Sequence, residues 1–277
     1  MFKRLYVTIA ASCLLLTADA QGLRTPAPSP SQMVRQDFGI SSVELNYSRP
    51  AMRGRTIMGD LVPYGKVWRT GANSATRLKF ADDVTIGGQA LKAGEYAVFT
   101  IPGQREWEII INKGTANWGT DYKQENDVIR FKAPVSTTTT PVESFTIQFA
   151  NIKSTAMDIQ MMWDRTVVTI PVSVDVDKKI MGQIDQLMNR DNRPYFNAAM
   201  YYMENGKDLN QALLWFDKAA EANPDAYWIQ HQRANALAKL GRKQDAMAAA
   251  QKSMEGARKA GNEDYVRLNE KLLASLK

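Results

Sequence analysis

The sequence predicts a β-plus-α protein of two domains, an antiparallel β-sandwich or jelly-roll-like domain followed by a small helical domain. Three observations support this. The length of 277 residues allows two hydrophobic cores. From about residue 35 to 176, apolar residues recur at every second position, as in half-buried strands. From residue 177 to 277 the spacing changes to three and four, as on one face of a helix.

The first residues have the pattern of a secretory signal peptide over positions 1–20. Lys3 and Arg4 precede an apolar run over residues 5–16, and Ala18-Asp19-Ala20 supplies a cleavage site after Ala20. The run is shorter than the roughly 20 residues of a membrane-spanning helix. We therefore expect an exported, periplasmic or extracellular protein that does not span the membrane. Lipid attachment at Cys13 is the lesser alternative, because the usual Leu three places earlier is missing.

Removal of residues 1–20 takes away Cys13, the only cysteine. The mature chain then has no disulfide, thiolate nucleophile or cysteine-ligated zinc. Residues 21–34, which include the string TPAPSPSQ, have the composition of a flexible spacer.

The predicted β domain covers residues 35–176. Its strand candidates are Val43–Tyr47, Thr76–Phe80, Val84–Ile86, Glu95–Ile101, Trp107–Ile111, Asp127–Lys132, Phe145–Phe149, Ile159–Trp163 and Thr166–Val176. No amphipathic helix fits between them, which favours antiparallel pairing. Gly87-Gly88 suits a tight hairpin, and Trp107 and Trp163 are predicted core residues.

Three details of this domain are less regular. The loop over residues 113–124 carries Trp118 and Tyr122, and the STTTT string at 136–140 is expected to be a polar tether. Pro171 predicts that the last strand lies at a sheet edge.

The helical domain begins with Asp177 as the expected N-cap. Further along, Ala212, Phe216, Ala219 and Pro224 have the spacing of the second helix of a tetratricopeptide repeat. The region 194–259 therefore resembles two such repeats, although the first helix of each lacks the usual Trp and Leu-Gly positions. Two repeats form either a groove for a protein partner or a small bundle that stabilises the chain.

Several kinds of chemistry are excluded by composition. The single histidine, His231, lies in the helical domain and is expected on a helix surface, so the β domain has no Ser-His-Asp triad or multi-histidine metal centre. No phosphate loop or metalloprotease motif is present. We assign no catalytic residue, cofactor or metal, and the export signal argues against nucleic-acid binding.

The candidate site is the stretch Tyr47–Thr76. Seven basic residues and one acidic residue lie between positions 46 and 79, an excess that equals the net charge of +6 of the whole chain. Its glycines permit tight turns, and its arginines suit carboxylate, phosphate or sulfate groups.

The same stretch carries a family resemblance. Its motifs are Tyr47-Ser48-Arg49-Pro50, Gly54-Arg55, Val62-Pro63-Tyr64-Gly65 and Trp68-Arg69-Thr70-Gly71-Ala72-Asn73. These strings resemble the signature of Domain of Unknown Function 2911, a family of exported bacterial proteins, and the likeness extends over about residues 33–174. The resemblance implies export and a domain boundary but supplies no activity.

The expected function is non-catalytic binding of an anionic or carbohydrate-like ligand near Tyr64–Asn73. The candidate ligand-binding residues are Arg49, Arg55, Tyr64, Trp68, Arg69, Thr70 and Asn73. A structural alternative pairs the arginines with Glu44, Asp60 or Glu95 and makes Trp68 a core residue. Two further alternatives are a carboxylate-dependent hydrolase or isomerase that uses Arg69 and Asn73, and a scaffold that acts through the helical domain.

Overall fold

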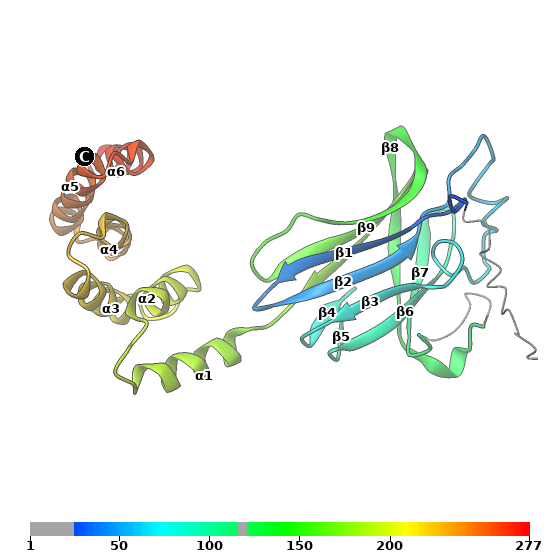
Figure 1. Cartoon of the computed structure of the whole chain (residues 1–277), viewed down its shortest axis with the longest axis horizontal. Helices are drawn as coiled ribbons and strands as arrows, with labels where there is room; N and C mark the ends of the chain where they lie inside the picture. Colours follow the sequence, from blue (N-terminus) through cyan, green and yellow to red (C-terminus); the bar gives the residue numbers. More distant parts are fainter. Residues whose placement is uncertain (1–24, 116–120) are drawn as a thin grey trace, which may run out of the picture. The chain divides into compact units, whose positions relative to one another are not determined.

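The computed structural model describes residues 25–115 and 121–277. They form two compact units, one that ends at Asp175 and one from Val176 to Lys277 (Figure 1). The expected signal peptide, the start of the spacer and Trp118 lie outside the described residues.

The first unit consists of nine strands. They are β1 (Ser31–Phe38), β2 (Ser41–Ser48), β3 (Thr76–Phe80), β4 (Val84–Ile86), β5 (Gln89–Leu91), β6 (Gly94–Ile101), β7 (Glu106–Asn112), β8 (Asp127–Ala150) and β9 (Ala156–Ser173). Every pairing is antiparallel, in the order β1-β2-β3-β6-β7-β8-β9-β4-β5. The predicted antiparallel class is therefore confirmed.

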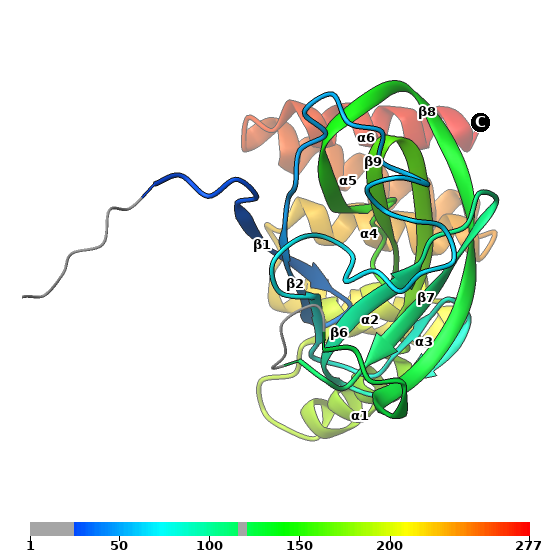
Figure 2. The same cartoon turned by 90° about the vertical axis from the view of Figure 1, so that its right-hand side faces the viewer.

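The long strand β8 converts one sheet into two layers. Its residues 127–134 pair with β7, and its residues 135–150 pair with β9. Figure 2 shows β8 as a single curved strand. The inner faces of the two layers meet at Tyr47 and Phe145, whose ring centroids are 6.0 Å apart. Trp107 and Trp163 are 1% and 2% exposed, which confirms them as core residues.

Three expectations for this unit are corrected. Residues 31–34, expected as part of the spacer, belong to β1, whose alternate side chains are exposed and give little hydrophobic signal. The STTTT string is part of β8, with register shifts beside it rather than a break. Pro171 does not mark a sheet edge, because β9 lies between β8 and β4; pairing with β8 ends at Val168.

The second unit has six helices: α1 (Asp177–Met188), α2 (Tyr195–Glu204), α3 (Leu209–Ala222), α4 (Tyr227–Lys239), α5 (Lys243–Lys259) and α6 (Glu263–Ser275). The helices α2 to α6 pack against their sequence neighbours as successive tetratricopeptide-like pairs and a closing helix. The small residues Ala212, Ala246 and Ala250 are fully buried and allow close helix approach. Among the described residues, no helix is long and apolar enough to cross a membrane.

Two residues of this unit differ from expectation. The N-cap of α1 is Val176, and Asp177 in the first turn instead accepts hydrogen bonds from Tyr201 (2.8 Å) and Lys207 (2.9 Å). His231 is not a surface residue: it is 7% exposed, and its Nδ1 lies 2.8 Å from Asn269 Oδ1. A partner 38 positions later in the chain explains its burial.

Candidate functional site

The stretch Tyr47–Thr76 links β2 to β3 and is fastened to β6 at its centre. Trp68 N donates to Thr100 O (2.7 Å), and Thr100 N donates back to Trp68 O (2.9 Å). This bridge fixes the backbone on both sides of Trp68 and places its side chain between the two layers.

Trp68 lies in an aromatic cluster with three core rings. Its ring stacks on Trp163 at 5.9 Å and meets Phe145 and Trp107 edge-on at 5.0 Å and 5.9 Å. Its Nε1 donates to Gly71 O (3.1 Å). Trp68 is half-buried, and its contacts with core rings favour a packing role over a platform for a sugar.

Arg49 is fully engaged inside the fold. Its Nε donates to Phe145 O (3.1 Å), Nη1 to Gln32 Oε1 (3.1 Å) and Nη2 to Thr146 Oγ1 (2.7 Å). These bonds join the end of β2 to β1 and β8. The neighbouring Tyr47 hydroxyl accepts from Ile147 N (3.0 Å), and burial raises the pKa of Tyr47 above its ordinary value.

Arg55 and Tyr64 make local contacts. Arg55 is exposed, but its Nε and Nη2 donate to Met52 O (2.9 Å) and Ala51 O (2.7 Å). Tyr64 is 39% exposed, and its ring covers Gly59 so closely that a Cβ there would lie 2.7 Å from it.

Thr70 and Asn73 shape the turn that follows Trp68. Both have positive φ angles, 58° in each case. Thr70 is buried, and its Oγ1 lies 3.2 Å from Thr100 Oγ1. Asn73 Nδ2 donates to Ser29 O and Ser48 Oγ, both at 3.2 Å. The turn thus ties the segment before β1 to the end of β2.

Arg69 differs from its neighbours. Its Nε is buried and has no hydrogen-bond partner, and the described residues include no carboxylate that pairs with its guanidinium. Two of the three acids expected to pair with the arginines of the stretch pair elsewhere: Glu44 with Lys79 (3.7 Å) and Glu95 with Arg77 (3.5 Å). The stretch therefore satisfies its arginines with carbonyl and hydroxyl oxygens, and leaves Arg69 without a partner.

A second candidate, which the sequence did not indicate, lies where the β8–β9 turn meets β9 and the β4–β5 turn. It is a depression of about 720 Å³. Its lining residues are Thr85, Gly88, Asn151, Ile152, Lys153, Ala156, Met157, Asp158, Pro171, Val172 and Ser173. They come from three separate segments, so no single motif could have identified the depression.

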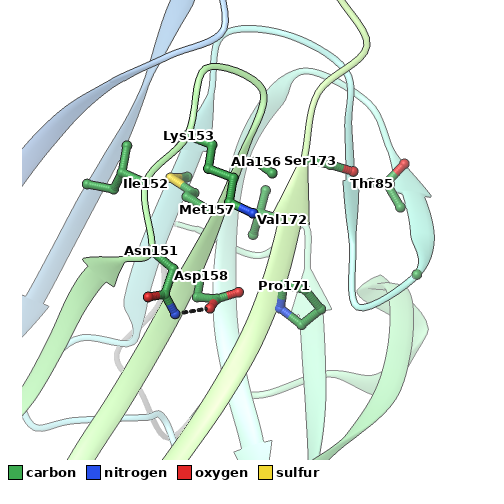
Figure 3. A pocket seen from close by; sticks show the side chains of 11 residues that line it. Thr85, Asn151, Ile152, Lys153, Ala156, Met157, Asp158, Pro171, Val172 and Ser173 are labelled. Carbon is green, nitrogen blue, oxygen red and sulfur yellow. Dashed lines mark hydrogen bonds between the residues drawn. The ribbon is translucent and has the colours of Figure 1, made fainter. Parts of the chain in front are cut away.

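The depression combines an apolar floor with polar groups around it (Figure 3). Met157 and Val172 are buried, and Asn151 Nδ2 donates to Asp158 Oδ2 (2.7 Å). The Lys153 side chain runs from the turn towards the middle of the depression. The Lys153 ammonium group forms no hydrogen bond and no ion pair with any of the described residues. Lys153 is therefore a free cation beside an apolar surface.

A third polar cluster lies on β7 and β8 and is closed by internal bonds. Tyr122 OH donates to Asp127 Oδ2 (2.7 Å), and Arg130 binds Asp127 (2.7 Å) and Glu108 (3.4 Å). Burial and the bond to Asp127 raise the pKa of Tyr122 to about 12. The phenol therefore stays protonated at neutral pH, and the Tyr122 hydroxyl is not a base there. Within residues 25–115 and 121–277, no group of three or more His, Cys, Asp or Glu side chains is arranged for a metal.

Comparison with known proteins adds a family but no activity. Among curated proteins, none is significantly similar to this chain. Among solved structures, a tetratricopeptide repeat domain protein from Salinibacter ruber is similar over 30% of this chain and 91% of that one, with 18% identity and a TM-score of 0.28. The family described as "Protein of unknown function (DUF2911)" matches residues 29–172. That match covers just over half of the sequence, and the chain belongs to this family.

Proposed function

We propose that the chain is an exported, non-catalytic binding protein whose β domain holds a small anionic, carbohydrate-like ligand in the depression at the β8–β9 turn. The sequence predicted an anionic or carbohydrate-like ligand at Tyr64–Asn73. The contacts of the described residues favour the depression, because most candidate residues of the stretch are already bonded within the fold.

The single observation that carries the proposal is the unpaired Lys153 ammonium beside a depression of about 720 Å³. Volumes of about 300–1,000 Å³ are typical of sites for small ligands. An unpaired cation next to apolar surface gains most when a carboxylate or phosphate group approaches it.

The other lining groups suit a polyhydroxylated molecule. The Thr85 and Ser173 hydroxyls come from register partners on β4 and β9, and Asp158 retains an oxygen that can accept from a ligand hydroxyl. The exposed side chains of Ile152 and Pro171, which also line the depression, offer an apolar surface to the face of a sugar ring. A sugar acid combines all three features: a carboxylate, hydroxyl groups and an apolar ring face.

A non-catalytic role is favoured over the enzyme alternative. A hydrolase or isomerase at the predicted site needs a carboxylate beside Arg69 and Asn73. Among the described residues, Arg69 has no such partner, and Asn73 binds Ser29 and Ser48 instead.

Arg69 is a second candidate site for the same ligand class. The Arg69 guanidinium has no carboxylate partner among the described residues, and a bound anion would supply one. This candidate and the depression lie on different segments, so one experiment separates them.

The experiment is a thermal-shift titration of the chain from residue 21 onward with D-glucuronate, D-glucose, acetate and inorganic phosphate. A ligand at about 100 times its Kd stabilises the folded state by about 2.7 kcal/mol. We expect D-glucuronate to raise Tm more than glucose or acetate does. Lys153→Met should remove the shift. The matched control is Lys66→Met, because Lys66 is an exposed lysine that does not line the depression.

Each outcome is decisive. A shift lost in Lys153→Met but kept in Lys66→Met supports the depression. A shift kept in Lys153→Met but lost in Arg69→Met assigns the ligand to Arg69. If none of the four compounds shifts the Tm of the wild-type chain, the proposed ligand class is wrong.

A further inference from the structure

We infer that the helical unit carries a separate binding groove for an extended, uncharged peptide segment of a partner protein, with the Gln230 amide as its central recognition group. The groove lies within the second unit and is independent of the ligand proposed for the β domain.

The groove consists of two hollows that share a wall. One, of about 600 Å³, is bounded by α3, α4 and α5, and the other, of about 440 Å³, is bounded by the α3–α4 turn, α4 and α5. Pro224, Gln230 and Lys252 line both of them. The two hollows therefore adjoin and together form the groove, with Gln230 among the residues where they meet.

Gln230 is the observation that points to a ligand. It is only 4% exposed, yet its side-chain amide makes no hydrogen bond to any described residue. Both polar atoms of the amide retain some solvent-accessible surface. The amide therefore faces the groove.

A glutamine amide without a partner at a nearly buried position is unusual. Buried polar groups are nearly always hydrogen-bonded, and one that is not loses free energy on folding. Gln230 contrasts here with other buried polar residues of the same unit. His231, Ser253 and Asn269 bind one another or the backbone at 2.7–2.8 Å.

The charges around the groove select against a strongly charged ligand. In the first hollow, two acids, Asp217 and Glu221, are matched by Arg233 and Lys252. Asp217 and Arg233 also pair directly at 2.5 Å.

The second hollow is balanced in the same way. Its acids are Asp225 and Glu255, and its bases are Lys252 and Lys259. Because Lys252 lines both hollows, the whole groove has four acidic and three basic residues. An excess of a single negative charge gives a strongly charged ligand little advantage.

The chemistry of an amide identifies the occupant. A primary amide offers a donor and an acceptor in one plane, which match the C=O and N–H of a peptide unit. The groove spans two adjoining hollows, and small residues such as Ala220, Ala248 and Gly256 line it. Small side chains let the backbone of an occupant approach closely. An extended main chain fits this combination better than a compact ligand does.

The test is selection of random dodecapeptides, displayed on phage, against the full chain from residue 21. Enriched peptides are then synthesised, and their Kd values are measured by fluorescence anisotropy. Gln230→Met removes the amide and keeps a side chain of similar length. Ala248→Tyr fills the groove from an exposed position outside the core. Gln251→Ala is the matched control, an exposed glutamine of α5 that lines neither hollow.

We expect enriched peptides to bind Gln230→Met about tenfold more weakly, as for the loss of one or two hydrogen bonds. Ala248→Tyr should prevent binding, and Gln251→Ala should leave it unchanged. Circular dichroism checks that each variant is folded; if Gln230→Met is not, Ala248→Tyr decides alone.

Three results would overturn the inference. The first is that no peptide is enriched over a display control without the protein. The second is that enriched peptides bind Ala248→Tyr as tightly as the wild type. The third is a dimer in sedimentation that Ala248→Tyr dissociates, because the groove would then hold a second copy of the chain.

Discussion

The stretch Tyr47–Thr76 and the β8–β9 turn are both polar regions of the same β domain, but they use their polar groups differently. In the stretch, Arg49 and Asn73 donate to oxygens of four neighbouring segments, and Trp68 packs among three core rings. In the turn, Lys153 has no partner among the described residues and lies beside an open depression. Both regions are rich in residues that bind ligands elsewhere, so residue type alone does not distinguish a structural brace from a site. The supply of internal hydrogen-bond partners does.

The largest test of this comparison is Trp68→Ala. It removes a half-buried ring that contacts Trp107, Phe145 and Trp163. Truncation of a fully buried aromatic residue destabilises a protein by about 3–5 kcal/mol, so we expect a loss near the lower end of that range. Denaturant unfolding followed by the fluorescence of the remaining tryptophans measures the loss. Tyr64→Ala, which removes a 39% exposed ring of the same stretch, should cost less than half as much. Equal losses would show that the contacts of Trp68 with the three core rings contribute little to stability.

Gly71→Ala tests the close contact of the stretch with β2. Gly71 has a φ of 142°, and a Cβ there would lie 2.9 Å from Ser48 O. Strain and contact together should destabilise the domain by about 1–3 kcal/mol. Gly65→Ala is the control, because Gly65 also has a positive φ but no atom within 4 Å of the added Cβ. In chemical denaturation, Gly65→Ala should lose less stability than Gly71→Ala. A larger loss for Gly65→Ala would argue against a tight contact at Gly71.

A pH titration tests whether the cluster of Tyr122, Asp127 and Arg130 also stabilises the fold. Burial and the bond to Asp127 raise the pKa of Tyr122 from 10.0 to about 12. The unfolded chain therefore ionises first, and the stabilisation is complete below pH 10 and lost as the pH rises through 12. We expect the urea midpoint to fall over this window, and to fall less in Tyr122→Phe. Parallel curves for the two proteins would contradict an internal role for the Tyr122 hydroxyl.

The smallest expected effect is that of Arg69→Met. Because Arg69 makes no side-chain hydrogen bond within the described residues, its removal should change the free energy of unfolding by about 0.5 kcal/mol or less. Thermal unfolding of the variant beside the wild type measures the change. A loss comparable to that of Gly71→Ala would mean that Arg69 is part of the brace.

The parts of the fold that the sequence predicted depend on local pattern. The change of period at Asp177 marks the start of α1, and Gly87-Gly88 forms a hairpin with φ angles of 56° and 79°. Alternation placed Trp107 and Trp163 in the core. These signals act over a few neighbouring residues, so they can be recognised without knowledge of the tertiary contacts.

The features that the sequence could not predict depend on distant partners. One acceptor of Arg49 is the backbone carbonyl of Phe145 on β8. Every residue has such a carbonyl, so the sequence does not indicate it. His231 is buried because Asn269 on α6 meets it. The depression at Lys153 joins ordinary residues from three segments. In each case the sequence gives the type of the residue, but it does not show whether the hydrogen-bonding groups of that residue are already paired within the fold.

The most direct test of the account compares Arg49→Met with Lys153→Met in chemical denaturation. Each substitution replaces a long cation by the same apolar side chain. Arg49→Met removes three hydrogen bonds and should destabilise the domain by about 2 kcal/mol, as for hydrogen bonds to a charged group. Lys153→Met should stay within about 0.5 kcal/mol of the wild type. A large loss of stability for Lys153→Met with little change for Arg49→Met would contradict the account. Lys153 would then be the residue that stabilises the fold, and Arg49 would not.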